Sequence, residues 1–206
     1  MFGSWSDPFD GKLGVLNSDT NWTTRFFGNE GADFQLGNNQ LDAPPGPLAL
    51  ATFGLAAASE GQDWTMALDT GFYGAGVIGA AICGYQDGSS YYALQIQDLT
   101  GADTGAWVIR FVRRANGVDT VLWEIGSADR EDSSAVFDHY KLYRLAIDYS
   151  AATGAFALSV GDSASPETPL YSTTVSDSAF SAGSFGLMSK VSGASAFDGF
   201  AIQINE

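Results

Sequence analysis

The sequence is poor in the two side chains that most often build reactive or metal-binding centres. It has one cysteine, Cys83, and one histidine, His139. A single cysteine excludes an internal disulfide, and a single histidine excludes sites built from several histidines and argues against a Ser/His/Asp triad. Cys83 follows the apolar residues Ala80, Ala81 and Ile82, so we expect a buried and unreactive thiol.

Positive charge and long apolar runs are also scarce. Nine Lys and Arg residues stand against 24 Asp and Glu residues, which gives a formal net charge of −15. Such a field repels nucleic acid and anionic membrane surfaces, so we expect neither as a partner. No apolar run approaches the roughly 18 residues that a membrane span needs. With 45% hydrophobic and 16% charged residues, the chain also lacks the composition of a disordered protein.

The helical spacing of apolar residues is nearly absent, whereas turn-forming residues are frequent. The 206 residues include 25 Gly, and short apolar runs lie between Gly, Asp, Ser and Asn. This pattern is typical of many short strands joined by turns. We therefore predict an all-β, antiparallel fold, organised as a single domain over residues 1–206, because sandwiches of this length form one unit.

The clearest strands alternate apolar and polar residues with a period of two. They are predicted at residues 91–97, 107–114, 120–125, 140–149 and 155–160, and further strands at 32–36, 48–53, 64–68 and 77–85. The pair Asn116-Gly117 predicts a tight hairpin turn, and Thr153-Gly154 predicts a second one.

The order of several segments resembles the concanavalin A-like, laminin-G-like jelly-roll superfamily. The segments are SSYYALQI (89–96), WVIRFVRRANGVDTVLWE (107–124), HYKLYRLAIDYSAATGAFALSVGD (139–162), SAGSFGLMS (181–189) and SAFDGFAIQI (195–204). The segment SWSDPFDG (4–11) looks like the opening strand that pairs with the closing one. The resemblance implies an antiparallel two-sheet β-sandwich with one concave face. Members include glycanases, non-catalytic modules and structural proteins of virions and cell surfaces, so the resemblance implies the fold more directly than the function.

No strand carries the paired carboxylates of a glycanase. Such enzymes of this fold commonly have a Glu-x-Asp-x-x-Glu strand, which sets two carboxylates across one scissile bond. Here Glu60, Glu124, Glu131 and Glu167 stand apart. We therefore predict no catalytic residues, although residues distant in the sequence can converge.

The predicted ligand-binding residues are Tyr91, Gln95, Arg110, Arg114 and Trp123. The two arginines share the non-core face of one strand, and an arginine fork can bind sugar hydroxyls, carboxylates or an acidic neighbouring subunit. Tyrosine and tryptophan rings that point away from the core can stack on sugars. The alternative is that the aromatic rings belong to the core and that the arginines pair across strands with Asp148, Glu124 or Gln95.

A structural calcium ion is predicted at Asp7, Asp10 and Asp198. Calcium prefers several oxygen ligands, and related sandwiches often carry a structural calcium where the first and last strands meet. The alternative is that these aspartates hold turns.

Two functions remain open. The first is a non-catalytic structural protein on the surface of a phage virion, such as a capsid decoration or a tail or fibre component, that binds glycans. It would form a homo-oligomer, contact other virion or surface proteins, and be located on the virion or outside the cell. Residues 1–11 lack the basic start and apolar segment of a signal peptide, and release by lysis needs no export signal. The second is a secreted carbohydrate-binding module or glycoside hydrolase or lyase of the same fold.

Overall fold

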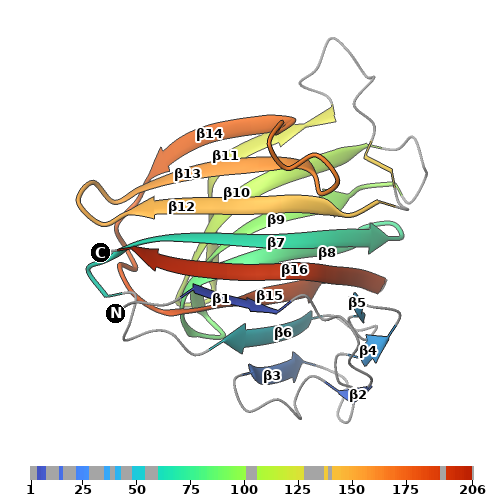
Figure 1. Ribbon diagram of the computed structural model, residues 1–206, viewed down its shortest axis with the longest axis horizontal. Helices are drawn as coiled ribbons and strands as arrows, with labels where there is room; N and C mark the ends of the chain where they lie inside the picture. The colour runs from blue at the N-terminus through green and yellow to red at the C-terminus, as the bar shows by residue number, and fades with distance from the viewer. Residues whose placement is uncertain are drawn as a thin grey trace.

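The computed structural model describes residues 4–7, 14–15, 22–27, 35–37, 40–42, 48–53, 60–100, 106–127, 137–138, 141–190 and 194–205. These residues form strands in two antiparallel sheets that face each other (Figure 1). This arrangement confirms the predicted all-β, two-sheet sandwich. In the described residues, no helix is long and apolar enough to cross a membrane.

Within the described ranges, the first sheet has nine strands and the second has seven. The first runs in the order β14-β13-β12-β7-β16-β5-β4-β2, and β1 also pairs with β16. Its strands are β1 (Ser4–Asp7), β2 (Gly14–Val15), β4 (Gln35–Gly37), β5 (Gln40–Asp42), β7 (Asp63–Tyr73), β12 (Tyr143–Ser150), β13 (Ala155–Asp162), β14 (Tyr171–Ser176) and β16 (Ala194–Asn205).

The second sheet runs in the order β11-β10-β9-β8-β15-β6-β3. Its strands are β3 (Trp22–Phe27), β6 (Leu48–Phe53), β8 (Ile78–Asp87), β9 (Ser90–Asp98), β10 (Trp107–Ala115), β11 (Val118–Gly126) and β15 (Ser184–Lys190). In Figure 1 the nine-stranded sheet lies in front of the seven-stranded one.

The alternation in the sequence assigns side chains to the two faces of each sheet. In β12, Tyr143, Leu145 and Ile147 are buried, whereas Arg144 and Asp148 lie on the opposite face. Successive side chains of a strand point to opposite sides, so one set enters the core and the other meets solvent. The predicted strands at 91–97, 107–114 and 155–160 are found with one or two more residues at an end.

Aromatic rings from both sheets fill the space between them. Trp64 of β7 stacks on Tyr149 of β12 at 5.1 Å and meets the edge of Phe185 of β15 at 4.9 Å. Phe156 of β13 contacts Tyr92 of β9 at 4.8 Å. Because large apolar surfaces are removed from water here, this layer supplies the main driving force that holds the sheets together.

Two local features predicted from the sequence are present. The first strand, β1, pairs with the last strand, β16, with Asp7 opposite Phe200. Asn116 and Gly117 both have positive φ, 50° and 81°, as the tight turn between β10 and β11 requires. The histidine at 139 lies outside the described residues.

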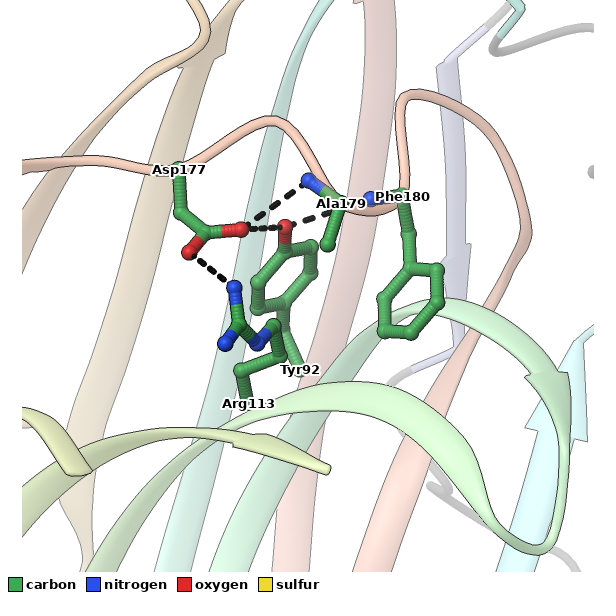
Figure 2. A network of polar contacts seen from close by, with 5 residues as sticks. All are labelled: Tyr92, Arg113, Asp177, Ala179 and Phe180. Atoms are coloured by element: carbon green, nitrogen blue, oxygen red, sulfur yellow. Dashed lines mark hydrogen bonds and ion pairs between the residues drawn. The ribbon is translucent and has the colours of Figure 1, made fainter. Parts of the chain in front are cut away.

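A polar network joins the ends of the two sheets (Figure 2). Asp177 follows β14 and accepts hydrogen bonds from the Tyr92 hydroxyl and the Ala179 N–H, the latter at 3.0 Å. Its second oxygen lies 2.7 Å from Nη1 of Arg113 in β10. Burial and the hydrogen bond to Asp177 raise the pKa of Tyr92. The network ties a chain segment after the nine-stranded sheet to two strands of the other sheet.

Cys83 lies in the core as predicted, and its side chain is closed to solvent. Burial raises the pKa of the thiol, and the thiolate is the reactive form. We expect iodoacetamide at pH 8 to leave Cys83 unmodified in the folded protein and to label it fully in guanidinium chloride, as read by intact mass. Rapid labelling of the folded protein would contradict this burial.

Candidate functional site

Four of the predicted ligand-binding residues lie on one surface. Arg110 is opposite Gln95, and Arg114 is opposite Tyr91, on the neighbouring strands β10 and β9. All four side chains point to the outer face of the seven-stranded sheet, because the alternate residues Tyr92, Leu94 and Ile96 enter the core. The structure thus brings together Tyr91, Gln95, Arg110 and Arg114; that they bind a ligand remains a prediction.

The ring of Tyr91 is not available as a stacking platform on that face. Tyr91 is 6% exposed and stacks on Tyr85 at 6.2 Å between centroids. Its hydroxyl donates to Sδ of Met188 at 3.7 Å, and burial raises its pKa. These side chains belong to an apolar outer-face cluster: Leu50, Ile78, Ala80, Ile82, Tyr85, Tyr91, Ala93 and Met188. Tyr91 therefore points to the outer face as predicted, but the prediction that its ring is exposed is wrong.

The two arginines already have acidic partners. Arg110 pairs with Glu124 of β11 and also donates to Oε1 of Gln97 at 3.0 Å. Arg114 pairs with Asp119 of β11 at 2.7 Å. Cross-strand pairing with Glu124 was the alternative interpretation of Arg110, whereas Asp148 lies in the other sheet. Each partner neutralises a positive charge that an anionic ligand would need.

Trp123 does not share this surface, so its predicted placement is wrong. It lies opposite Phe111, whose side chain is closed to solvent in the core, and it packs against that core. A bulge between Phe111 and Val112 shifts the register of β10 and β11. Such a bulge reverses the in-and-out alternation beyond it, and no residue pattern in β10 or β11 predicts it.

Near the predicted calcium site, the positive charge beside the carboxylates is the guanidinium of Arg144. Asp198 lies opposite Asp69 in β7, and both carboxylate oxygens of Asp69 accept hydrogen bonds from Arg144, at 2.7 and 2.9 Å. The Asp198 carboxylate accepts from the N–H of Gly199 at 2.7 Å. In the described part of the chain no three His, Cys, Asp or Glu side chains form a metal-binding group. Asp10 lies outside that part, and of Asp7 only the backbone is described, so calcium stays a prediction.

The outer face of the nine-stranded sheet is hollowed instead. A groove of about 410 Å³ lies over β16, β7 and β12, which run side by side in Figure 1. Ala201, Ala67 and Ala146 form its floor, each opposite the next in register, and the same row of small side chains continues across the sheet through Ser159 and Ser172. Because none of these side chains is longer than a serine, a ligand can approach the sheet closely here.

Polar side chains flank the floor on both sides. One neighbouring row runs through Gln203, Thr65 and Asp148. On the other side lie Arg144 and the turn between β13 and β14, which contributes Glu167. That turn lies against the outer face of β13, since a Cβ placed at Gly161, opposite Arg144, would lie 3.1 Å from the Cα of Pro169. The groove therefore offers hydrogen-bond donors and acceptors along two banks.

Asp148 occupies the centre of this face. A second hollow of about 270 Å³ lies over β13 and β14, and Asp148 lines both hollows. The surrounding protein removes part of the hydration of the carboxylate, and this raises the pKa of Asp148. The side chains next to Asp148 on the same face are Thr65, Ala157 and Ala146. The second carboxylate that lines the groove, Glu167, comes from the turn between β13 and β14 and not from a strand next to Asp148.

The sequence pattern does not predict this groove. Its floor residues are ordinary small residues on separate strands, and they matter only because the register aligns them. The available signal was the alternation of β12, which predicted Tyr143, Leu145 and Ile147 inward and hence Arg144 and Asp148 outward. That alternation identifies an outward strand face but gives no information about its neighbours.

The chain superposes along nearly its whole length on several solved structures. The chain superposes on the CBM2 module of the evolved Dit of Lactobacillus casei BL23 phage J-1 with a TM-score of 0.63 and 13% identity, covering 98% of this chain and 97% of that chain. It superposes on the Bacillus licheniformis beta-glucanase with a TM-score of 0.56 and 12% identity, covering 99% of each chain. The basic winged bean lectin with Tn-antigen gives 0.59 and 9% identity, covering 100% of this chain and 99% of that chain.

The protein therefore has the concanavalin A-like jelly-roll fold, as the sequence resemblance implied. No family model and no curated protein matches the chain by sequence. Structures with this fold include a carbohydrate-binding module, lectins and a beta-glucanase, so the fold is shared by binding proteins and enzymes.

Proposed function

We propose that this chain is a non-catalytic, glycan-binding module displayed on the exterior of a phage particle, and that the groove on the nine-stranded sheet is its binding surface. The observation that carries the proposal is the groove itself: small side chains at its floor and polar side chains along its banks. Sugars offer many hydroxyl groups, and a shallow groove with amide, hydroxyl and carboxylate groups can pair with several of them.

The dimensions of this face suit an extended ligand. The two hollows together span five neighbouring strands from β16 to β14. With adjacent strands about 4.8 Å apart, this distance is about 19 Å, which is the length of a short oligosaccharide. The floor runs across the strands, so the ligand lies across the sheet.

A binding role is favoured over hydrolysis by the arrangement around Asp148. A retaining glycosidase holds two carboxyl groups about 5 Å apart across the scissile bond. The strand neighbours of Asp148 carry Thr65, Ala157 and Ala146 at the adjacent positions. The likeness to the phage Dit module supports display on a phage particle, as does the net charge of −15, which favours solubility outside the cell.

Filling the floor tests the proposed binding surface. In Ala146→Phe, the new ring points outward into the groove, so we expect glycan binding to fall at least about tenfold while the thermal midpoint stays within about 4 °C of the wild type. A glycan array finds the ligand, and titration calorimetry measures the loss. Ser176→Phe adds a ring to the same outer face outside both hollows, and it should bind like the wild type.

Three results would overturn parts of the proposal. Equal glycan binding by Ala146→Phe and wild type would place the site elsewhere. Release of reducing sugar by the wild type, lost in Asp148→Asn, would establish the alternative of a glycoside hydrolase. Immunogold electron microscopy of particles released by lysis of the cells that encode this chain should label the particle surface; a chain found only in the soluble fraction would contradict virion display.

A further inference from the structure

The Asp148 carboxylate lies between the two hollows of this face, and the described residues provide no hydrogen-bond or ion-pair partner for it. The burial that raises its pKa is opposed by no cation. A carboxylate in this state gains from any ligand that donates hydrogen bonds to it.

Among the described residues that line the groove, the one cation is Arg144, and its charge is already neutralised. Arg144 donates to both oxygens of Asp69. Asp198 and Glu167 add further negative charge around it, and these interactions raise the pKa of Arg144. Among the described residues, an anionic ligand would therefore find no unpaired positive charge at the Arg144 side of the groove. On the other side it would meet the carboxylate of Asp148, whose charge no cation compensates.

From this distribution of charge we infer that the groove selects uncharged glycans and rejects those that carry carboxylate or sulfate groups, and that Asp148 determines this selection. The inference rests on the proposed function, because it specifies the ligand of the same groove. Hydroxyl groups of an uncharged sugar donate to Asp148 in place of the water that solvates this exposed carboxylate. A carboxylate or sulfate placed there brings like charges together and donates nothing.

The test uses a panel of neutral oligosaccharides, each paired with its uronic acid or sulfated counterpart. We expect the wild type to bind the neutral member of a pair at least about tenfold more tightly than the acidic member, since a hydrogen bond to a charged group is worth at least about that factor. In Asp148→Asn, which keeps the size of the side chain, this ratio should fall to within about threefold.

The control variant is Asp87→Asn on the seven-stranded sheet. It makes the same change of side chain and of net charge far from the groove, at an exposed residue whose Oδ1 accepts hydrogen bonds from Ser89, which an asparagine oxygen can also accept. If Asp148 acts locally, Asp87→Asn keeps the wild-type ratio. A similar fall of the ratio in both variants would show that the overall charge of the chain, rather than Asp148, excludes acidic glycans.

The outcomes separate this inference from the proposed function. Wild-type protein that binds the acidic member as tightly as the neutral one overturns the selection but leaves glycan binding intact. An unchanged ratio in Asp148→Asn assigns the selection to other residues and also overturns the inference. Binding of no glycan by the folded wild type contradicts the proposed function, and the selection fails with it.

Discussion

Replacing Gly183 by Ala is expected to lower the free energy of unfolding by about 4 kcal/mol. Gly183 precedes β15 and has a φ of 152°. A Cβ atom at this position would lie 2.3 Å from the carbonyl carbon of Gly84 and 2.6 Å from the backbone nitrogen of Tyr85. Both contacts are with backbone of β8, which cannot rotate away as a side chain can. The start of β15 must therefore move away from β8, at the centre of the seven-stranded sheet.

Gly61→Ala is the matched control for this prediction. Gly61 also has a positive φ, 69°, but no atom lies within 4 Å of a Cβ placed there. Only the backbone strain of an L residue applies, which costs about 1 kcal/mol. Urea denaturation followed by tryptophan fluorescence measures both variants. If Gly183→Ala proves no less stable than Gly61→Ala, the close approach between β8 and the start of β15 is wrong.

The second large effect is expected in Asp177→Ala, which should cost about 3 kcal/mol. The Asp177 side chain is 11% exposed and accepts hydrogen bonds from Tyr92, Arg113 and Ala179. Its removal leaves the Arg113 guanidinium, which is only partly exposed, without its counter-charge (Figure 2). For a chain of 206 residues this corresponds to a fall in Tm of about 6 to 12 °C, measurable by calorimetry.

Asp119→Ala removes a comparable ion pair from a more exposed place. Asp119 pairs with Arg114 at 2.7 Å, and 45% of its side chain is exposed. Water screens exposed pairs, so we expect a cost of no more than about 0.5 kcal/mol. Equal losses in the two variants would mean that the network at Asp177 does not tie the sheets together.

The sequence predicted the side of the sheet to which a side chain points better than it predicted which other side chains lie around it. The alternation in residues 91–97 and 107–114 placed Arg110, Arg114, Gln95 and Tyr91 on one outward face, as found. The same alternation could not show that Tyr91 and Tyr85 would pack into a buried outer-face cluster, because burial depends on what lies over the sheet. It also failed beyond the bulge at Phe111, where the side of Trp123 is reversed.

The groove depends on information that a single strand does not contain. Ala67, Ala146, Ser159 and Ala201 come from four strands separated by long stretches of sequence, and only their register aligns them. A shift of one residue in any of these pairings would send that strand's floor residue into the core and break the row. The pairing of β1 with β16 was predicted from the resemblance to the jelly-roll superfamily. The pairings that build the groove could be seen only in the structure.

The most direct test of the proposed binding surface is a ¹H–¹⁵N NMR titration of the assigned protein with a glycan selected on the array. We expect the largest chemical-shift changes at Ala67 and Ala146, on the floor of the groove of the nine-stranded sheet, and at Ser159 in the neighbouring hollow. Changes concentrated instead at Tyr91, Gln95, Arg110 and Arg114 would place the ligand on the seven-stranded sheet and contradict the groove as the binding surface.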